Sequence, residues 1–269
     1  MDEDAPRITI VTEYFYPEEA STAQLLTSLA TGLQGDFDVS VLTGRPNYHP
    51  GDETESVPTR EQHKGVSIER LPATRLDKDT LPFRVVNWIT FTLLVFWRLA
   101  RSRGSDDVVL VLSNPPLLPL AAWAAKRICD ISYGYLIYDM YPDFPVALEM
   151  ISADSTVARW WEKVMRMVYR DADRIVVLGD SMKERLTQKM SEEPGFAPTK
   201  IEVIPNWEVR PGTGAHGFVH ASVLRQHRAL PRAPHGHRRH RAFGGAGPGR
   251  HRVRDHRRGR SQVGSPAVR

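Results

Sequence analysis

Residues 7–26, RITIVTEYFYPEEASTAQLL, read as a strand, an aromatic loop and the start of a helix in immediate succession. Apolar and β-branched residues dominate 8–11, Pro17 ends that run, and apolar residues then recur at helical spacing. We expect Ser21 or Thr22 to cap the helix. The stretch predicts the first β-loop-α unit of a parallel α/β sheet, in which ligands bind beyond the carboxyl ends of the strands.

The alternation of strand and helix patterns continues to residue 207. This predicts an α/β fold with a doubly wound, Rossmann-like parallel sheet and right-handed crossovers. The polar segment 45–64 is rich in helix and strand breakers and is expected to be a loop. Further strands are expected at 37–44, 66–71, 108–112, 133–138, 174–179 and 200–207, and helices at 82–100, 118–128, 155–170 and from 180, with Asp180 or Ser181 as the last cap.

The composition changes sharply near residue 210. Residues 1–209 contain 22 Lys+Arg and 31 Asp+Glu, a net charge of −9, whereas 210–269 contain 14 Arg and one acid, a net charge of +13. The second part also has 8 of the 10 histidines, 10 of the 19 glycines and only two aromatic residues. It cannot bury enough apolar surface to fold alone, so we expect a domain at 1–209 and a disordered Arg/His/Gly-rich tail at 210–269.

The tail has a second interpretation at the level of the gene. If the codons from about Val223 onward are read from their second base, the genetic code permits the strings YSGNIGRFHEL and TAIDAIERL, and then FVIIGEG across 253–259. These strings alternate as loop, amphipathic helix and buried strand, as a second α/β domain would begin. The hypothesis is a frameshift between Glu208 and Val223, which the coding DNA would test.

Several classes of site and location are disfavoured by composition. Cys129 is the only cysteine, so no internal disulfide or clustered thiolate metal site is expected. His49 and His63 are isolated in a polar loop, and we predict no bound metal. The acidic start of the chain lacks an apolar run, which argues against a secretory signal and favours the cytoplasm.

Residues 82–103 contain an apolar helix with two tryptophans and arginines at both ends. Such a helix suits the plane of a membrane interface. The alternative is a helix wedged between the sheet and its neighbours. Its longest apolar run, 85–97, is short and interrupted by polar residues, so a membrane span is not expected.

Five motifs in order resemble the N-terminal half of family 4 glycosyltransferases, especially those that assemble capsular, O-antigen and lipid-linked saccharides. They are YFYPEE with Ser-Thr at 14–22, LTGRPNY at 42–48, SNPP at 113–116, YDMYPD at 138–143 and VIPNW at 203–207. The resemblance covers about residues 7–207.

This resemblance implies a GT-B enzyme, in which two Rossmann-like domains face each other across a cleft. The first domain holds the acceptor and the second holds a sugar nucleotide, and transfer is retaining and needs no metal or other cofactor. The second domain grips the donor partly through a pair of glutamates. Asp255 is the only acid in 210–269, so the donor-binding half is expected to be missing.

The resemblance and the strand ends also suggest site residues. Asp139 is the first candidate for contact with the sugar or acceptor, and the alternative is a carboxylate that caps the turn before Pro142. Asp143 is expected to be a helix N-cap that presents backbone N–H groups to the cleft.

Further candidates are individually weaker. Relatives have a glycine pair in the first loop where this chain has Ala20, Ser21 and Thr22, but hydroxyl groups at a helix N-terminus can still receive a phosphate. Packing or cleft lining would explain the residues at the domain junction. The acceptor-side candidates are Glu13, Tyr14, Ser21, Thr22, Arg45 and Asp143, and those at the junction are Asn206 and Trp207.

Three functional hypotheses follow. The first is a truncated, inactive fragment of a hexosyltransferase that acts on a lipid-linked or saccharide acceptor at the inner face of the cell membrane. The second is a non-catalytic, membrane-associated acceptor-binding subunit that needs a separate donor-binding chain. The third, nucleic-acid binding through the tail, is least favoured because the basic residues are not interleaved with aromatic ones.

Overall fold

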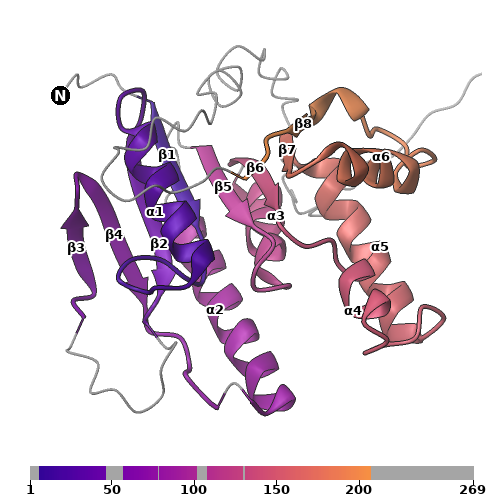
Figure 1. Ribbon diagram of the computed structural model, residues 1–269, viewed down its shortest axis with the longest axis horizontal. Helices are drawn as coiled ribbons and strands as arrows, with labels where there is room; N and C mark the ends of the chain where they lie inside the picture. Colours follow the sequence, from indigo (N-terminus) through magenta and orange to yellow (C-terminus); the bar gives the residue numbers. More distant parts are fainter. Residues whose placement is uncertain (1–5, 47–56, 78, 102–107, 130, 207–269) are drawn as a thin grey trace, which may run out of the picture. The chain divides into compact units, whose positions relative to one another are not determined.

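The computed structural model describes residues 6–46, 57–77, 79–101, 108–129 and 131–206 (Figure 1). The strands are β1 (Arg7–Val11), β2 (Asp38–Gly44), β3 (Arg60–His63), β4 (Val66–Leu71), β5 (Val108–Leu112), β6 (Ser132–Ile137), β7 (Arg174–Val177) and β8 (Ile201–Val203). The helices are α1 (Ser21–Leu33), α2 (Leu81–Arg101), α3 (Leu118–Cys129), α4 (Asp143–Ala147), α5 (Thr156–Asp171) and α6 (Asp180–Lys189), with a 3-10 turn at Pro198–Lys200.

The eight strands form one sheet in the order β3-β4-β2-β1-β5-β6-β7-β8. Every pairing is parallel except that of β3 with β4. The predicted α/β class with a parallel sheet is therefore confirmed. The strand order reverses direction between β1 and β5, and a reversal of this kind marks the ligand-binding crevice of open α/β sheets.

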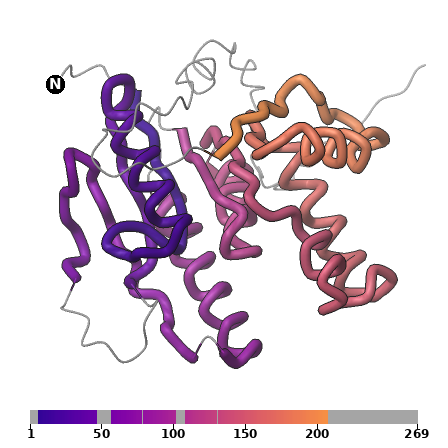
Figure 2. Tube along the Cα trace, viewed as in Figure 1, coloured from indigo at the N-terminus to yellow at the C-terminus, as the bar shows by residue number. Residues whose placement is uncertain are grey.

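The hairpin at the β3 edge was not predicted, because residues 45–64 were expected to be a loop. Figure 2 shows the chain turning back from β3 along β4 at this edge. The two-residue turn uses Lys64 and Gly65 with φ values of 48° and 84°, both in the left-handed region that such hairpin turns require. Gly65 between two extended segments was the sequence signal for this hairpin.

Alternation along the strands divides the core into two layers. Val11 and its neighbours on one face pack with α2, α3 and α5, whereas Ile8 and Ile10 face α1. Residues 109–112 of β5 are buried on both faces, as a continuous apolar run in the centre of a parallel sheet predicts.

A serine side chain caps α5, where the sequence predicted only that a helix begins at residue 155. Ser155 lies at the N-cap of α5, and its Oγ accepts a hydrogen bond from Ala158 N at 3.1 Å. The caps predicted for α1 and α6 are wrong, because Ala20 and Gly179 hold those positions and no side chain caps either helix. The four residues expected to cap begin the helices instead: Ser21, Thr22, Asp180 and Ser181.

The buried side of α5 also differs from the expected one. The apolar residues of 155–170 predict a buried side made of Trp160, Trp161, Val164, Met167 and Val168, of which Val168 is confirmed. The buried residues are Ala158, Met165, Val168 and Tyr169, and Trp160 is 59% exposed. Tyr169 is fully buried and stacks on Tyr135 of β6. The side of α5 that bears Tyr169 therefore faces the sheet.

Candidate functional site

Three loops meet where the strand order reverses. They follow β1, β5 and β6, which are neighbours in the sheet and parallel, so their carboxyl ends lie at one edge. The loops span residues 12–20, 113–117 and 138–142. This edge is where a ligand of an open α/β sheet is expected.

Ser113 joins two of these loops. It follows β5 directly and is fully buried, and its Oγ accepts hydrogen bonds from the backbone N–H groups of Tyr138 and Asp139 at 3.0 and 3.2 Å. Its own N–H donates to the Leu136 carbonyl. Ser113 therefore fixes the backbone from which the Asp139 side chain leaves the sheet, although the sequence offered no sign of this long-range role.

The Asp139 carboxylate is half-buried, and burial raises its pKa. Among the residues that the structure describes it accepts no hydrogen bond, so the alternative that it caps the turn before Pro142 is wrong. Its charge in turn raises the pKa of Tyr141. A carboxylate that costs solvation free energy without a protein partner is a feature of binding and catalytic sites.

Three tyrosines lie in the loops after β1 and β6. Burial raises the pKa of Tyr138 to about 12, and burial followed by the Asp139 charge raises that of Tyr141 to about 12. Burial, followed by the charges of Glu13 and Glu18, raises the pKa of Tyr14 further. All three hydroxyl groups therefore stay protonated at neutral pH, and that of Tyr14 is hydrogen-bonded to the Glu13 side chain.

The loop after β1 is anchored by Arg70 of β4, which is buried. The Nη2 atom of Arg70 donates to the Tyr16 carbonyl at 2.7 Å and forms an ion pair with Glu61, and its Nη1 atom donates to the Pro58 carbonyl at 3.0 Å. The Tyr16 ring also stacks on His63 of β3 at 3.6 Å between centroids. The unpredicted hairpin thus gives the loop a rigid support.

Glu13 lies in the same loop, half-buried. Its carbonyl accepts hydrogen bonds from Thr43 Oγ1 at 3.1 Å and from Gly44 N at 3.3 Å, both at the end of β2. Tyr14 follows it, and Arg45 is exposed just beyond β2 at the same edge. These three candidates are thus brought together around the ends of β1 and β2.

Asp143 has a different environment from the one expected. It is the first residue of α4, whose N-cap position is taken by Pro142, so the predicted N-cap is wrong. Its Oδ1 accepts a hydrogen bond from Lys189 Nζ at 2.8 Å, and the same ammonium donates to Glu162 at 2.7 Å. Asp143 therefore links α4 to α5 and α6.

The remaining predicted residues are spread along the edge. Ser21 is exposed and Thr22 half-buried in the first turn of α1, and Asn206 is exposed after β8. Trp207 and the whole 210–269 segment, with the expectations placed on them, lie outside the described residues.

Comparison with known proteins identifies the family. The model of the glycosyl transferase 4-like domain matches residues 22–207. The chain belongs to the glycosyl transferase 4-like family. This match covers the described sheet from α1 onward and confirms the resemblance found in the sequence.

Two relatives of this glycosyl transferase 4-like chain are about twice as long as the part that it matches. A probable glycosyltransferase, WbjE of Pseudomonas aeruginosa, is 24% identical over 201 residues, which cover 75% of this chain and 47% of that protein. Sucrose-phosphate synthase of Thermosynechococcus elongatus superposes with a TM-score of 0.50 at 13% identity, over 74% of this chain and 48% of that one. The chain spans about half the length of these relatives.

Metal ligands do not gather in the part of the glycosyl transferase 4-like chain that the structure describes. No group of three or more His, Cys, Asp or Glu side chains there could hold an ion. Cys129 is a half-buried free thiol whose Sγ lies 3.6 Å from the Ala100 carbonyl oxygen.

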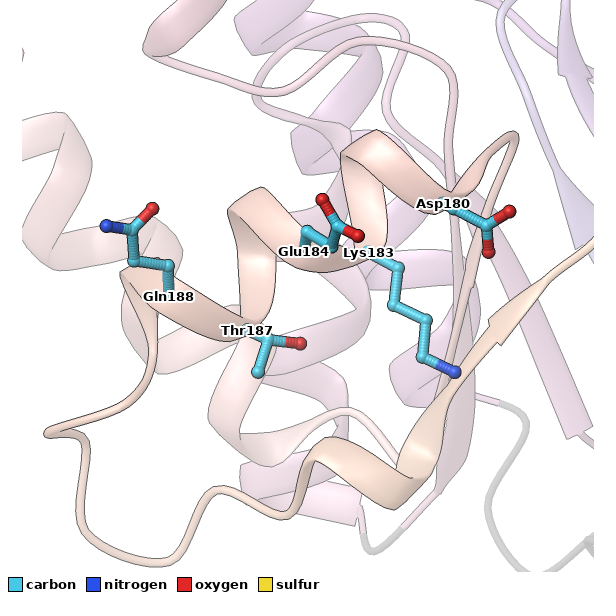
Figure 3. A pocket seen from close by; sticks show the side chains of 5 residues that line it. All are labelled: Asp180, Lys183, Glu184, Thr187 and Gln188. Atoms are coloured by element: carbon cyan, nitrogen blue, oxygen red, sulfur yellow. The ribbon is translucent and has the colours of Figure 1, made fainter.

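A separate pocket of ≈ 550 Å³ lies beside α6, and none of its lining residues belongs to the loops after β1, β5 and β6. Figure 3 shows its five lining side chains on this one helix, with Lys183 extending toward β8. The lining residues are Asp180, Lys183, Glu184, Thr187 and Gln188. They are hydrophilic and come from a single element, so the pocket lacks the convergence of elements seen at the strand ends.

Helix α2 has two unlike sides. Asn87, Phe91, Val95 and Leu99 are buried toward the sheet. The opposite side bears apolar residues that are 40 to 54% exposed: Val86, Ile89, Leu93 and Trp97. By length and composition α2 could cross a membrane, but 22% of its apolar window is buried within the fold.

Proposed function

We propose that this chain is the acceptor-side half of a glycosyltransferase that moves a hexosyl group from a sugar nucleotide to a lipid-linked or saccharide acceptor. The observation that carries the proposal is the half-buried Asp139 carboxylate at the strand reversal of a glycosyl transferase 4-like domain. The loop after β1, with Glu13 and Tyr14, supplies further polar groups at the same edge.

In the proposed reaction the bond between the sugar carbon and the donor phosphate breaks, and a bond from that carbon to an acceptor hydroxyl forms. The acceptor proton leaves with the nucleotide phosphate, so the balance needs no other reagent. Positive charge develops at the sugar carbon, and a nearby carboxylate stabilises it. In this proposal Asp139 contacts the sugar or acceptor, and Ser113 positions it.

The acceptor is proposed to be membrane-bound, with the chain peripheral at the cytoplasmic face. The exposed apolar side of α2 supports this, because residues 81–101 contain Arg84, Arg98 and Arg101 and no acid. Arg101 lies over the Trp97 ring at 5.6 Å. Tryptophan and arginine side by side on an apolar helix suit an anionic lipid interface.

A second copy of the chain fits this surface less well. Two α2 helices packed through their apolar sides would bring a basic end against a basic end in either orientation, because both ends of the helix carry arginine. Like charges across an interface disfavour association. An anionic membrane is complementary to both ends.

The chain as it stands is proposed to be truncated and inactive. It spans about half the length of its relatives, and the acids expected of a donor-binding domain have no counterpart in 210–269. The frameshift hypothesis attributes this to out-of-frame translation of the tail. The DNA around codons 205–225 tests it, and a sequence that cannot encode the alternative strings refutes it.

Transfer assays test the proposed activity. Sugar-nucleotide hydrolysis and transfer are measured with the chain alone, with the alternative frame restored, and with candidate donor-binding chains added. Activity only after the frame is restored supports the fragment, and loss of that activity in Asp139→Asn supports the site. Activity of the chain alone refutes truncation, whereas activity gained only on adding a separate protein supports the alternative of an acceptor-binding subunit.

Membrane contact is tested with phosphatidylcholine vesicles that contain phosphatidylglycerol. Trp97→Glu should reduce vesicle binding about tenfold or more, because a charge replaces an interfacial ring. Trp160→Glu is the matched control, since that ring is similarly exposed but lies on α5. Equal losses in the two variants, or no loss in Trp97→Glu, contradict contact through α2.

A further inference from the structure

Arg84 continues the buried side of α2 past the edge of the sheet. It precedes Asn87, Phe91 and Val95 by three, seven and eleven residues, which places all four on one side of the helix. Asn87 hydrogen-bonds Thr74 and Leu76 in the segment that follows β4. The first turn of α2 therefore lies by the carboxyl ends of the strands, and Arg84 is directed to that edge rather than outward.

The charge of Arg84 acts on two of the loops that form the candidate site. Its charge lowers the pKa of Tyr14, which follows β1, and that of Tyr141, which follows β6, against the larger effect of burial. It also lies over the Trp88 ring at 5.3 Å. The cation is thus close enough to the loops after β1 and β6 for its charge to act on a tyrosine of each.

Arg84 is half-buried, yet its guanidinium makes no hydrogen bond or ion pair with any residue that the structure describes. Arg98, on the same helix, instead bonds Glu69 at 2.9 Å. A half-buried guanidinium has five N–H donors to satisfy, and a phosphate matches its planar geometry. The position therefore suits an anion supplied by a ligand.

The surroundings of Arg84 fall into an order. On its solvent side, α2 exposes Leu81, Phe83 and Val86, which are 53, 46 and 40% accessible. Carboxylates lie toward the strand ends. After burial, the charge of Asp139 raises the pKa of Tyr141, and the charges of Glu13 and Glu18 raise that of Tyr14. Apolar surface, cation and carboxylates thus succeed one another from α2 toward the strand ends.

We infer that Arg84 binds the phosphate of a lipid phosphate or diphosphate acceptor, with the Tyr14 and Tyr141 hydroxyl groups beside it. The inference rests on the proposed function and deepens it. The order around Arg84 matches the order within such an acceptor: the lipid lies along the apolar side of α2, the phosphate at the guanidinium, and the sugar at the carboxylates, which accept hydrogen bonds from its hydroxyl groups.

Binding of farnesyl diphosphate, farnesol and inorganic pyrophosphate to the full chain tests this inference by titration calorimetry. The unsubstituted chain should prefer farnesyl diphosphate to both other probes. Arg84→Gln should weaken farnesyl diphosphate binding about ten- to hundredfold, the range for a hydrogen bond to a charged group, and leave farnesol binding unchanged. Arg84→Lys, which keeps the charge but loses the planar fork, should fall between.

Arg159→Gln is the control, because Arg159 is an exposed arginine on α5. It should change farnesyl diphosphate binding less than twofold. Equal losses in Arg84→Gln and Arg159→Gln would reduce the effect to general surface charge and overturn the inference, as would no loss in Arg84→Gln. Pyrophosphate binding as tight as that of farnesyl diphosphate would assign the site to a free anion and overturn the lipid source.

Failure here is separable from failure of the proposed function. If Arg84→Gln binds farnesyl diphosphate normally while transfer in the restored frame still depends on Asp139, only the assignment of Arg84 is wrong. Circular dichroism of each variant checks the fold. If Arg84→Gln does not fold, the loss of farnesyl diphosphate binding in Arg84→Lys is compared with that in Arg159→Gln.

Discussion

Replacement of Ser113 by alanine should destabilise the chain strongly for the loss of a single oxygen. The Oγ accepts from two backbone N–H groups, those of Tyr138 and Asp139, in a fully buried position. Alanine leaves both donors without this acceptor, and each unsatisfied donor costs about 1 to 2 kcal/mol when partly buried. The free energy of unfolding should therefore fall by about 2 to 4 kcal/mol.

Urea denaturation of the full chain, followed by circular dichroism, measures this loss. With a slope of about 2 kcal/mol/M, the midpoint should fall by about 1 to 2 M. Ser28→Ala is the control, because Ser28 Oγ is a buried atom without a hydrogen-bond partner among the described residues, and its removal should be nearly neutral. A Ser113→Ala midpoint within error of the Ser28→Ala midpoint would refute the assignment of Ser113 as the link between the two strand ends.

Three further predictions concern stability. Burial raises the native pKa of Asp139, so the native state binds more protons than the unfolded one and stability falls as pH rises above about 4. In urea denaturation, the free energy of unfolding of Asp139→Asn should therefore increase relative to that of the parent as pH rises, and a difference that does not depend on pH would contradict this. Gly65→Ala should lower the free energy of unfolding by about 1 to 2 kcal/mol because the φ of Gly65 is +84°, whereas Gly35→Ala, with open space around it, should leave it unchanged. Equal shifts in melting temperature would contradict the left-handed turn at Gly65. Lys189→Met removes the cation shared by Asp143 and Glu162, whose side chains are 21% and 26% exposed, and should lower the free energy of unfolding by about 2 kcal/mol in urea denaturation. Lys183→Met on the same helix should lower it little, and a similar loss in both variants would rule out the network.

The sequence predicted the parts of the fold that depend on local periodicity. The runs at 8–11 and 108–112 are buried strands, and α2 begins and ends within a residue of its predicted bounds. The hairpin was missed because the four polar residues at 60–63 carry no apolar alternation. The caps of α1 and α6 were misplaced because polar residues that can cap a helix are equally accommodated in its first turn, and only the backbone angles decide.

The candidate site was predictable in position but not in detail. Strand ends located Asp139 and Tyr14, because parallel strands bring their carboxyl ends to one edge. The contacts that organise the site join residues far apart in the chain, such as Ser113 with Asp139, and local patterns cannot reveal them. Asp143 was misjudged for the same reason, since its partner Lys189 is 46 positions away.

The Arg70 anchor has a consequence for biosynthesis. The loop after β1 gains its bond to Arg70 across 54 positions of sequence. A nascent chain therefore cannot fix this loop until β4 has left the ribosome and joined β2. The loop after β1 is among the first segments to be translated, but it must wait for β4, which is made later. The loop therefore becomes ordered only when the half of the sheet formed by β1 to β4 is complete.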